Sequence, residues 1–404
     1  MSLGPNGHGR GVVVAGAVRT AIGKFGGGLA GVHVADLGAV VVREAIKRAG
    51  LADAGAIDQT IVGHARQAGN GPNVGRQVAH FAGVPDERPA YTINMACASG
   101  MQAIVSGAQA VALGDSEVVL AAGVENMSRI PFLLPDQRWG RKLGDMPVAD
   151  AMYRDGYLCR LCNQVMGETA ETLVARYDIS RAAQDEFALL SHRRATAAWS
   201  DGRMAAEIVA VPVKGPRGQD LLFERDEAPR TDTSLEALAK LPPVFQKDGS
   251  VGAGNSSAIT DGAAALVVLA EERAPALGVT PMARVVAWAS AGVDAAEMGL
   301  GPVPAVRKVL AGTGLTMKDM ALVELNEAFA SQVLACDREL GFDRDRLNVN
   351  GGGIALGHPT GCSGTRIVVT LLHELARRKA RYGLATLCVS GGQGMAVLFE
   401  RLEH

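Results

Sequence analysis

Short apolar segments alternate with segments of helical length through the N-terminal part of the chain. The segments predicted to be strands here are 12–18, 57–62, 90–95 and 118–123. In segment 37–49, apolar residues recur three and four positions apart, which predicts one buried face of a helix. Strands that alternate with helices indicate a sheet protein of the α/β class.

Segment 99–113 has the length of a helix but carries no charged residue and many small ones. A helix that is apolar on every side must be buried on every side, so we expect it inside the molecule. We find no run of 18 or more apolar residues and therefore expect no membrane span and no membrane partner.

The middle of the chain, 124–251, breaks this alternation with frequent prolines and dense charges. Two amphipathic helices are predicted inside it, at 166–176 and 181–201. Regular alternation then resumes, with strands expected at 262–269, 284–291, 322–325, 348–350 and 385–389 and helices at 304–312 and 365–378. We therefore divide the chain into an N-terminal half (1–123 with 252–280), an inserted loop domain (124–251) and a C-terminal half (281–404).

A weak internal repeat accompanies this division. Strand, small-residue turn, helix and strand follow one another at 91–123 and again at 347–392. Two similar halves would explain the repeat, but α/β chains resemble themselves by default, so the pattern alone leaves a duplication open.

Composition excludes several classes of protein. Basic and acidic residues number 40 and 42, a net charge of −2, which argues against binding nucleic acid through a general positive field. Six cysteines scattered over 404 residues are no secreted disulfide framework. The N-terminus lacks an apolar signal core, and we expect a cytoplasmic protein.

Four polar side chains follow predicted strands in turns rich in small residues. Cys97 lies between a strand and the buried helix, where a helix N-terminus would favour the nucleophilic thiolate. His358 stands in a glycine-rich turn before Pro359 and is a candidate base. Cys388 and Asn326 each end an apolar strand. Each has an ordinary structural interpretation: a buried inert thiol for either cysteine, a loop histidine, or a helix N-cap for Asn326.

Other motifs are weak or absent. Cys159 and Cys162 form an isolated CxxC, and without a second pair at zinc spacing we expect no metal site. Gly23-Lys24 is followed by Phe25 and lacks the hydroxyl of a P-loop, and no G-x-S-x-G turn of a serine hydrolase occurs. Two thiols and one imidazole instead suit a two-stage acyl transfer, in which one thiol takes the acyl group and the other moves a proton on carbon.

At these residues the sequence resembles the thiolase family, from about Val14 to Phe399. The motifs that carry the resemblance are Cys97-Ala98-Ser99-Gly100, Asn326-Glu327-Ala328-Phe329, Gly357-His358-Pro359 and Cys388-Val389-Ser390-Gly391-Gly392. The resemblance implies a five-layer αβαβα fold of two similar halves with an inserted loop domain. It also implies a homodimer or homotetramer, with the loop domain binding coenzyme A and contributing oligomer contacts.

The resemblance further assigns roles at the site. Cys97 would be the acylated nucleophile, His358 its activator and Cys388 the acid and base for the α-carbon of acetyl-CoA. Asn326 would hold a water that forms one oxyanion hole with His358, and the N–H groups of Cys97 and Ser390 would form the other. Family members usually have glycine where Ser390 stands, but a backbone donor survives that change.

Coenzyme A and acetyl-CoA are implied as substrates, with no permanently bound cofactor. The matching positions for coenzyme A are Ser257, Arg230, Phe245, Met166, Met298 and Phe329. Val165 stands where short-chain members often have histidine, which favours a 3-ketoacyl-CoA thiolase of broader range that also accepts acetoacetyl-CoA. The alternatives are a non-catalytic acyl-CoA or lipid-binding relative, and a decarboxylating ketoacyl synthase, against which the second thiol speaks.

Overall fold

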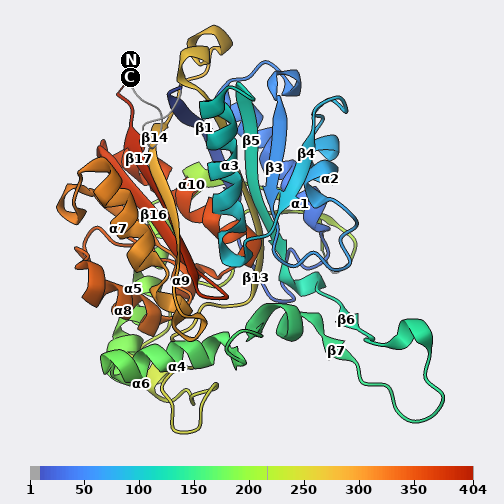
Figure 1. The fold of residues 1–404 in the computed structure, drawn as a ribbon, viewed down its shortest axis with the longest axis vertical. Coiled ribbons are helices and arrows are strands. Elements are labelled where there is room, and N and C mark those ends of the chain that lie inside the picture. Colours follow the sequence, from blue (N-terminus) through green and yellow to red (C-terminus); the bar gives the residue numbers. More distant parts are fainter. Residues whose placement is uncertain (1–9, 216, 404) are drawn as a thin grey trace.

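A computed structural model describes residues 10–215 and 217–403 (Figure 1). Residues 1–9, which make up most of the N-terminal stretch without a signal core, lie outside the described residues, as does residue 404.

The strands of the two halves follow the same spatial order. In the N-terminal half the order is β1 (Val12–Thr20), β13 (Thr260–Ala270), β5 (Val118–Asn126), β3 (Gln59–Gly63) and β4 (Ala90–Ile93). In the C-terminal half it is β14 (Ala283–Gly292), β17 (Gln393–Arg401), β16 (Tyr382–Val389) and β15 (Leu322–Leu325). A short pairing of β1 with β14 joins the two sets of strands into one sheet. The repeated order explains the weak repeat in the sequence.

Helices cover both faces of each strand set and complete the five layers that the resemblance implies (Figure 1). The outer layer of the N-terminal half contains α1 (Val34–Ala49) and α2 (Val74–Phe81), and that of the C-terminal half contains α7 (Pro302–Thr313) and α8 (Ala330–Leu340). Between the two strand sets lie α3 (Ser99–Leu113) and α10 (Thr360–Arg378), whose apolar side chains share one core with both.

The buried helix is as apolar as the sequence suggested. Segment Ala96–Leu113 is long and apolar enough to cross a membrane by length and composition, which our search for apolar runs missed. Its side chains pack against both strand sets, so a place in the core of the protein accounts for its composition.

The inserted region contains two longer helices and several short elements. They are β6 (Phe132–Leu133), β7 (Ala149–Asp150), β8 (Leu158–Cys159), β9 (Gln164–Val165), α4 (Met166–Tyr177), α5 (Arg181–Ser200), β10 (Ile208–Val209), β11 (Val211–Lys214), β12 (Asp220–Phe223) and α6 (Leu235–Ala239). Of these, β10 pairs with β1 of the main sheet. The β6–β7 hairpin projects away from the body of the molecule (Figure 1). Two further short elements, β2 (Gly23–Lys24) and α9 (Gly353–Leu356), belong to the N-terminal and the C-terminal half, respectively.

The predicted strand 348–350 is wrong. Only Leu347 forms a bridge, to Val323, and the next residues turn away with Asn348 at a φ of 46°. The side-chain amide of Asn348 takes over the pairing: its Oδ1 accepts from the Leu325 N–H at 2.9 Å and its Nδ2 donates to the Leu325 carbonyl at 2.8 Å. The pattern also missed α2, α8 and β17.

Candidate active site

Cys97 lies in a single 3₁₀ turn, Ala96–Ala98, between β4 and α3. Ala96 takes the left-handed conformation, with a φ of 46°, which aims the next residue out of the strand. Ser99 holds the turn by accepting from the Met95 N–H at 2.9 Å and donating to the Ala96 carbonyl at 2.6 Å. The turn packs against α10 and β16, the elements that carry the other candidate residues.

The backbone N–H groups that were expected to favour the Cys97 thiolate do not dominate its pKa. Burial raises the pKa of this thiol and outweighs the Arg66 guanidinium and the N–H groups of Ser390 and Cys97, which act in the opposite direction. Helix α3 begins two residues later, at Ser99, so Cys97 is not its first residue. The nucleophile therefore rests as a thiol and needs a base.

His358 can supply that base. Its Nδ1 lies 2.5 Å from the Ser363 Oγ, which also lies 3.0 Å from the Pro359 carbonyl. Because a carbonyl only accepts, the hydroxyl donates to Pro359 and accepts the Nδ1 proton, which leaves Nε2 as the basic nitrogen. Burial, followed by the charges of Arg366 and Arg66, lowers the pKa of His358 to about 3, so the ring is neutral near pH 7.

Asn326 follows β15 and lies beside the imidazole. Its Nδ2 is 3.5 Å from both ring nitrogens of His358, and its N–H donates to the Thr386 carbonyl of β16 at 3.0 Å. The alternative interpretation as a helix N-cap is wrong, because α8 starts later and Phe329 caps it. The Asn326 Oδ1 is buried without a partner among the described residues, which is a position suited to accept a hydrogen bond from a bound molecule.

Cys388 is the second-last residue of β16 and is almost fully buried. Burial raises its pKa well above the ordinary value, and a negative charge on Cys97 would raise it further. That mutual effect of the two sulfurs requires them to be close in space. Ser390, two residues after Cys388, turns its N–H towards the Cys97 sulfur.

The sequence missed the carboxylate that ties these loops together. Glu125 is fully buried and accepts from the Thr360 hydroxyl and the Gly361 N–H at 2.8 Å each, directly after the His358 turn. It also pairs with His64 at 2.9 Å. Burial alone would raise its pKa, but the His64 charge and these donors lower it to about 2. Glu125 thus holds the N-terminus of α10 against the neighbouring loop.

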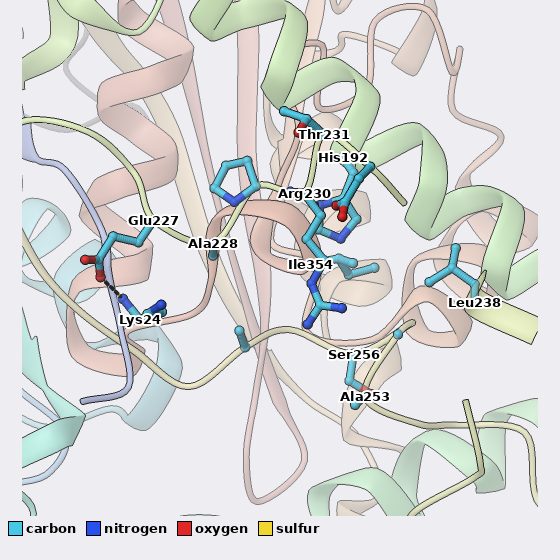
Figure 2. A pocket seen from close by; sticks show the side chains of 14 residues that line it. Lys24, His192, Glu227, Ala228, Arg230, Thr231, Leu238, Ala253, Ser256 and Ile354 are labelled. Atoms are coloured by element: carbon cyan, nitrogen blue, oxygen red, sulfur yellow. Dashed lines mark hydrogen bonds between the residues drawn. The ribbon is translucent and has the colours of Figure 1, made fainter. Parts of the chain in front are cut away.

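A cavity of about 510 Å³ opens beside the loops (Figure 2). Arg230 reaches into it, as the resemblance implies, with Lys24, His192 and Ser256 on the wall. Ser256 lines the cavity in place of the expected Ser257, whose N–H instead donates to the Ala328 carbonyl at 2.9 Å. The cavity approaches the catalytic candidates through Ala258, whose carbonyl accepts from the His358 N–H at 3.0 Å.

The apolar residues expected at coenzyme A lie deeper. Met166, Phe245, Met298 and Phe329 pack in one cluster with Cys388 and do not line the cavity wall. The Phe245 and Phe329 rings meet edge to face, 6.2 Å apart. The cavity is thus polar, with Lys24 and Arg230 balanced by Glu227 and Asp232, and a packed apolar cluster surrounds the second thiol.

These observations define an α/β protein with two thiols and a neutral imidazole at the junction of its halves. The family models described as thiolase, N-terminal domain and thiolase, C-terminal domain match residues 12–272 and 279–401. An acetyl-CoA acetyltransferase of Pseudomonas aeruginosa is 49% identical over 96% of this chain and 99% of its own length. One from Escherichia coli is 48% identical over 97% and 99%, respectively.

Solved structures agree. The crystal structure of a Bacillus anthracis acetyl-CoA acetyltransferase has a TM-score of 0.95 and 46% identity, covering 98% of this chain and 100% of its own. Human mitochondrial 3-ketoacyl-CoA thiolase in complex with CoA has a TM-score of 0.93 and 40% identity, covering 98% of each chain. The chain therefore belongs to the thiolase family. It is an acyltransferase of that family and not the non-catalytic relative considered as the alternative.

Proposed function

We propose that this thiolase transfers acyl groups between 3-ketoacyl-CoA and coenzyme A, releasing acetyl-CoA, or in reverse condenses two acetyl-CoA molecules to acetoacetyl-CoA. The proposal rests above all on the approach of Cys97 to Cys388 and on the contact of the Cys97 turn with α10, the helix that begins two residues after His358. Relatives named acetyl-CoA acetyltransferase and 3-ketoacyl-CoA thiolase support both directions.

The first half-reaction begins at Cys97. His358 takes the thiol proton at Nε2, and the sulfur attacks the 3-keto carbon of the substrate. The N–H groups of Cys97 and Ser390, which face the sulfur, are suited to stabilise the negative oxygen that forms. The C2–C3 bond then breaks, leaving an acyl group on Cys97 and the enolate of acetyl-CoA.

Cys388 completes that step. Its high pKa keeps the sulfur protonated, so it can donate this proton to the enolate carbon. Asn326, through a bound water, and His358 would stabilise the enolate oxygen. Before the second half-reaction the proton that His358 took from Cys97 passes to the Cys388 thiolate. Coenzyme A then gives its thiol proton to His358 and attacks the acyl-Cys97 thioester. The released Cys97 sulfur takes that proton back from His358, which restores the free enzyme.

The residues of the cavity support the coenzyme A site. Arg230 is suited to pair with a phosphate, although Glu227 and Asp232 on the same wall balance the charges of Arg230 and Lys24. Met166, Met298 and Phe329 suit the uncharged pantetheine arm. We propose coenzyme A and acetyl-CoA as substrates only, with no permanent cofactor. Val165 supports a broad chain-length range, and fatty-acid β-oxidation is the physiological role that we propose.

We further propose a cytoplasmic homodimer or homotetramer. All six cysteines are free, as in a reducing compartment. Strand β4 ends the sheet and pairs only with β3 among the described strands, which leaves an edge open for a second copy.

Turnover of acetoacetyl-CoA with coenzyme A tests the proposed chemistry. We expect the enolate absorbance of acetoacetyl-CoA to disappear with the wild type, and Cys97→Ser to lower the rate by about a thousandfold or more, because an alcohol is a far weaker nucleophile at neutral pH. Intact mass after exposure to acyl-CoA should show one acyl group, mapped to Cys97. No turnover by reduced wild-type protein would reject the proposal.

A further inference from the structure

The CxxC pair lies outside the proposed catalytic residues, in the β8–β9 hairpin. Cys159 ends β8 and pairs with Gln164 of β9, and the chain reverses through 160–163. Cys162 lies in this turn, three positions after Cys159. A tight turn brings residues at that separation to within about 7 Å between Cα atoms, which overlaps the span of about 4.4 to 6.8 Å that a disulfide requires.

Both cysteines pack at the same apolar cluster. The Cys162 thiol donates a hydrogen bond to the Cys159 sulfur, which also faces the N–H groups of Leu161, Cys162 and Gly391. Burial opposes ionisation of Cys159, but these donors hold its pKa below the ordinary value. Burial and the shared proton raise the pKa of Cys162. Of the two thiols, Cys159 therefore loses its proton more readily.

Small molecules can reach this pair. Arg160, Leu161 and Asn163 are exposed and Cys162 is partly exposed, whereas Cys159 lies buried beneath them. No group of three metal-ligating side chains occurs in the part of the chain that the structure describes. Two sulfurs alone do not make a structural zinc site, so thiol chemistry is the use that remains.

The hairpin also contacts a catalytic loop. The Gly391 N–H faces the Cys159 sulfur, and the Leu161 side chain lies 3.8 Å from where a Cβ on Gly391 would stand. The preceding residue, Ser390, directs its N–H at Cys97. Loss of the hydrogen bond between the Cys159 sulfur and the Gly391 N–H would therefore affect the residue next to Ser390, whose N–H belongs to the proposed oxyanion hole.

We propose that Cys159 and Cys162 form a redox-active dithiol that low-molecular-weight disulfides convert into an intramolecular disulfide, and that this oxidation slows turnover through Gly391. The disulfide itself is independent of the proposed function, whereas the effect on turnover rests on it. The catalytic thiols Cys97 and Cys388 are separate from this pair in sequence, but Cys388 packs in the same apolar cluster as Cys159.

The exchange balances with the external disulfide as the oxidant. With Cys159 ionised, the Cys162 thiol passes its proton to the Cys159 sulfur. The partly exposed Cys162 thiolate then attacks one sulfur of the external disulfide and releases the first thiolate. That thiolate takes the Cys159 proton, and the Cys159 sulfur then attacks Cys162 and releases the second thiolate, which solvent protonates. Two protein thiols are oxidised and one external disulfide is reduced to two thiols.

Trypsin offers a direct readout because Arg160 lies between the two cysteines. After treatment with oxidised glutathione, digestion without reductant should give peptides 155–160 and 161–176 joined by a disulfide, and dithiothreitol should separate them. Cys159→Ser should give no such link and retain glutathione on Cys162. Reduced Cys162→Ser should keep wild-type turnover within about twofold, as for a surface substitution.

Turnover tests the second part of the proposal. Cross-linked wild type should turn over about three- to tenfold more slowly, as expected when one hydrogen bond to Gly391 is lost, and dithiothreitol should restore the rate. Linkage only between peptides that carry Cys97 and Cys388, or no linkage at all, would overturn the dithiol. Complete 159–162 linkage with unchanged turnover would overturn its coupling to the catalytic loop.

Discussion

At the scale of single residues, burial decides the protonation of the catalytic groups. Cys97 and Cys388 rest as thiols because burial raises both pKa values, and His358 rests neutral because burial and two nearby guanidinium groups lower its pKa. Each group therefore starts in the protonation state that the proposed first step requires. Proton transfer from Cys97 to His358 becomes favourable only when negative charge moves from sulfur onto the substrate oxygen.

The low pKa of His358 predicts an unusual pH profile. The base is active when neutral, and a pKa near 3 keeps it neutral throughout the range where a free histidine would become protonated as the pH falls. We expect kcat/KM for thiolysis to stay level between about pH 8 and pH 5. Stopped-flow or steady-state rates in buffers of constant ionic strength measure this directly.

His192 provides the control for that profile because it lines the cavity without a proposed catalytic role. His192→Asn keeps an acceptor near the Arg230 N–H, to which the His192 Nδ1 is bonded at 3.2 Å. The variant should show the same level profile as the wild type. An acid limb centred near pH 6.5 in both proteins would contradict a buried, neutral His358.

Glycine sets the contact between elements at the centre of the molecule. A Cβ on Gly100 of α3 would lie 2.5 Å from the Thr365 Oγ1 and 2.8 Å from the Gly361 carbonyl, both in α10. Gly364 is equally close to Met101 of α3. The two buried helices thus approach each other closely at their N-terminal ends. The turns that carry Cys97 and His358 lead directly into these ends.

Gly100→Ala should therefore destabilise the protein, even though alanine favours a helix. The new methyl group must push α3 away from α10, and we expect a loss of about 2 to 4 kcal/mol, typical of overpacking or worse in a rigid core. Urea denaturation followed by circular dichroism measures the difference in free energy of unfolding.

Gly312→Ala is the matched control. Gly312 lies in α7, and a Cβ there meets nothing within 4 Å. This variant should gain about 0.5 to 1 kcal/mol from helix propensity and reduced freedom of the unfolded chain. Equal effects of the two substitutions would show that the α3–α10 contact is looser than the structure indicates.

The elements that the sequence predicted well are those with a clear period and turn residues at both ends, such as 118–123 and 385–389. The failure at 348–350 has a local cause, because the Asn348 side chain imitates a peptide group and ends the strand after one bridge. Helix α8 was missed because it buries polar Ser331 and Gln332 among its apolar residues, which hides its buried face. Strand β17 was missed although its apolar run 395–399 is long enough to predict a buried strand.

The candidate site shows where sequence reasoning stops. Cys97, His358, Cys388 and Asn326 stand in recognisable turns, so their residue types and positions were visible. Glu125 gave no signal, because its role comes from contacts with residues up to 236 positions away. The net direction of the Cys97 pKa was also out of reach, since the local motif shows the N–H groups that lower it but not the burial that raises it.

At the scale of the whole molecule, two similar halves contribute different chemistry to one site. The N-terminal half supplies Cys97 from the turn between β4 and α3, and the C-terminal half supplies His358 before α10, in the corresponding position of its own repeat. The central layer formed by α3 and α10 holds these two turns together. A site at this junction depends on the packing of the halves and not on either one alone.

The β6–β7 hairpin exposes several large apolar side chains. Trp139 and Leu143 near its tip are 88% and 89% exposed, and Phe132 at its base is 68% exposed. Large apolar side chains gathered on a projecting hairpin are unfavourable in water unless another surface covers them. If the proposed homotetramer forms from two dimers, we expect this hairpin to make the contact between the dimers.

The double variant Trp139→Ser, Leu143→Ser tests this contact. We expect light scattering on a sizing column to report a smaller assembly than for the wild type, with turnover per chain within about twofold because the tip carries no proposed catalytic residue. Leu222→Ser on β12, at a residue that is 63% exposed, is the matched control and should leave the mass unchanged. An identical mass for the double variant and the wild type, with both folded by circular dichroism, would rule out the hairpin as the contact and leave the open edge of β4 as the remaining surface.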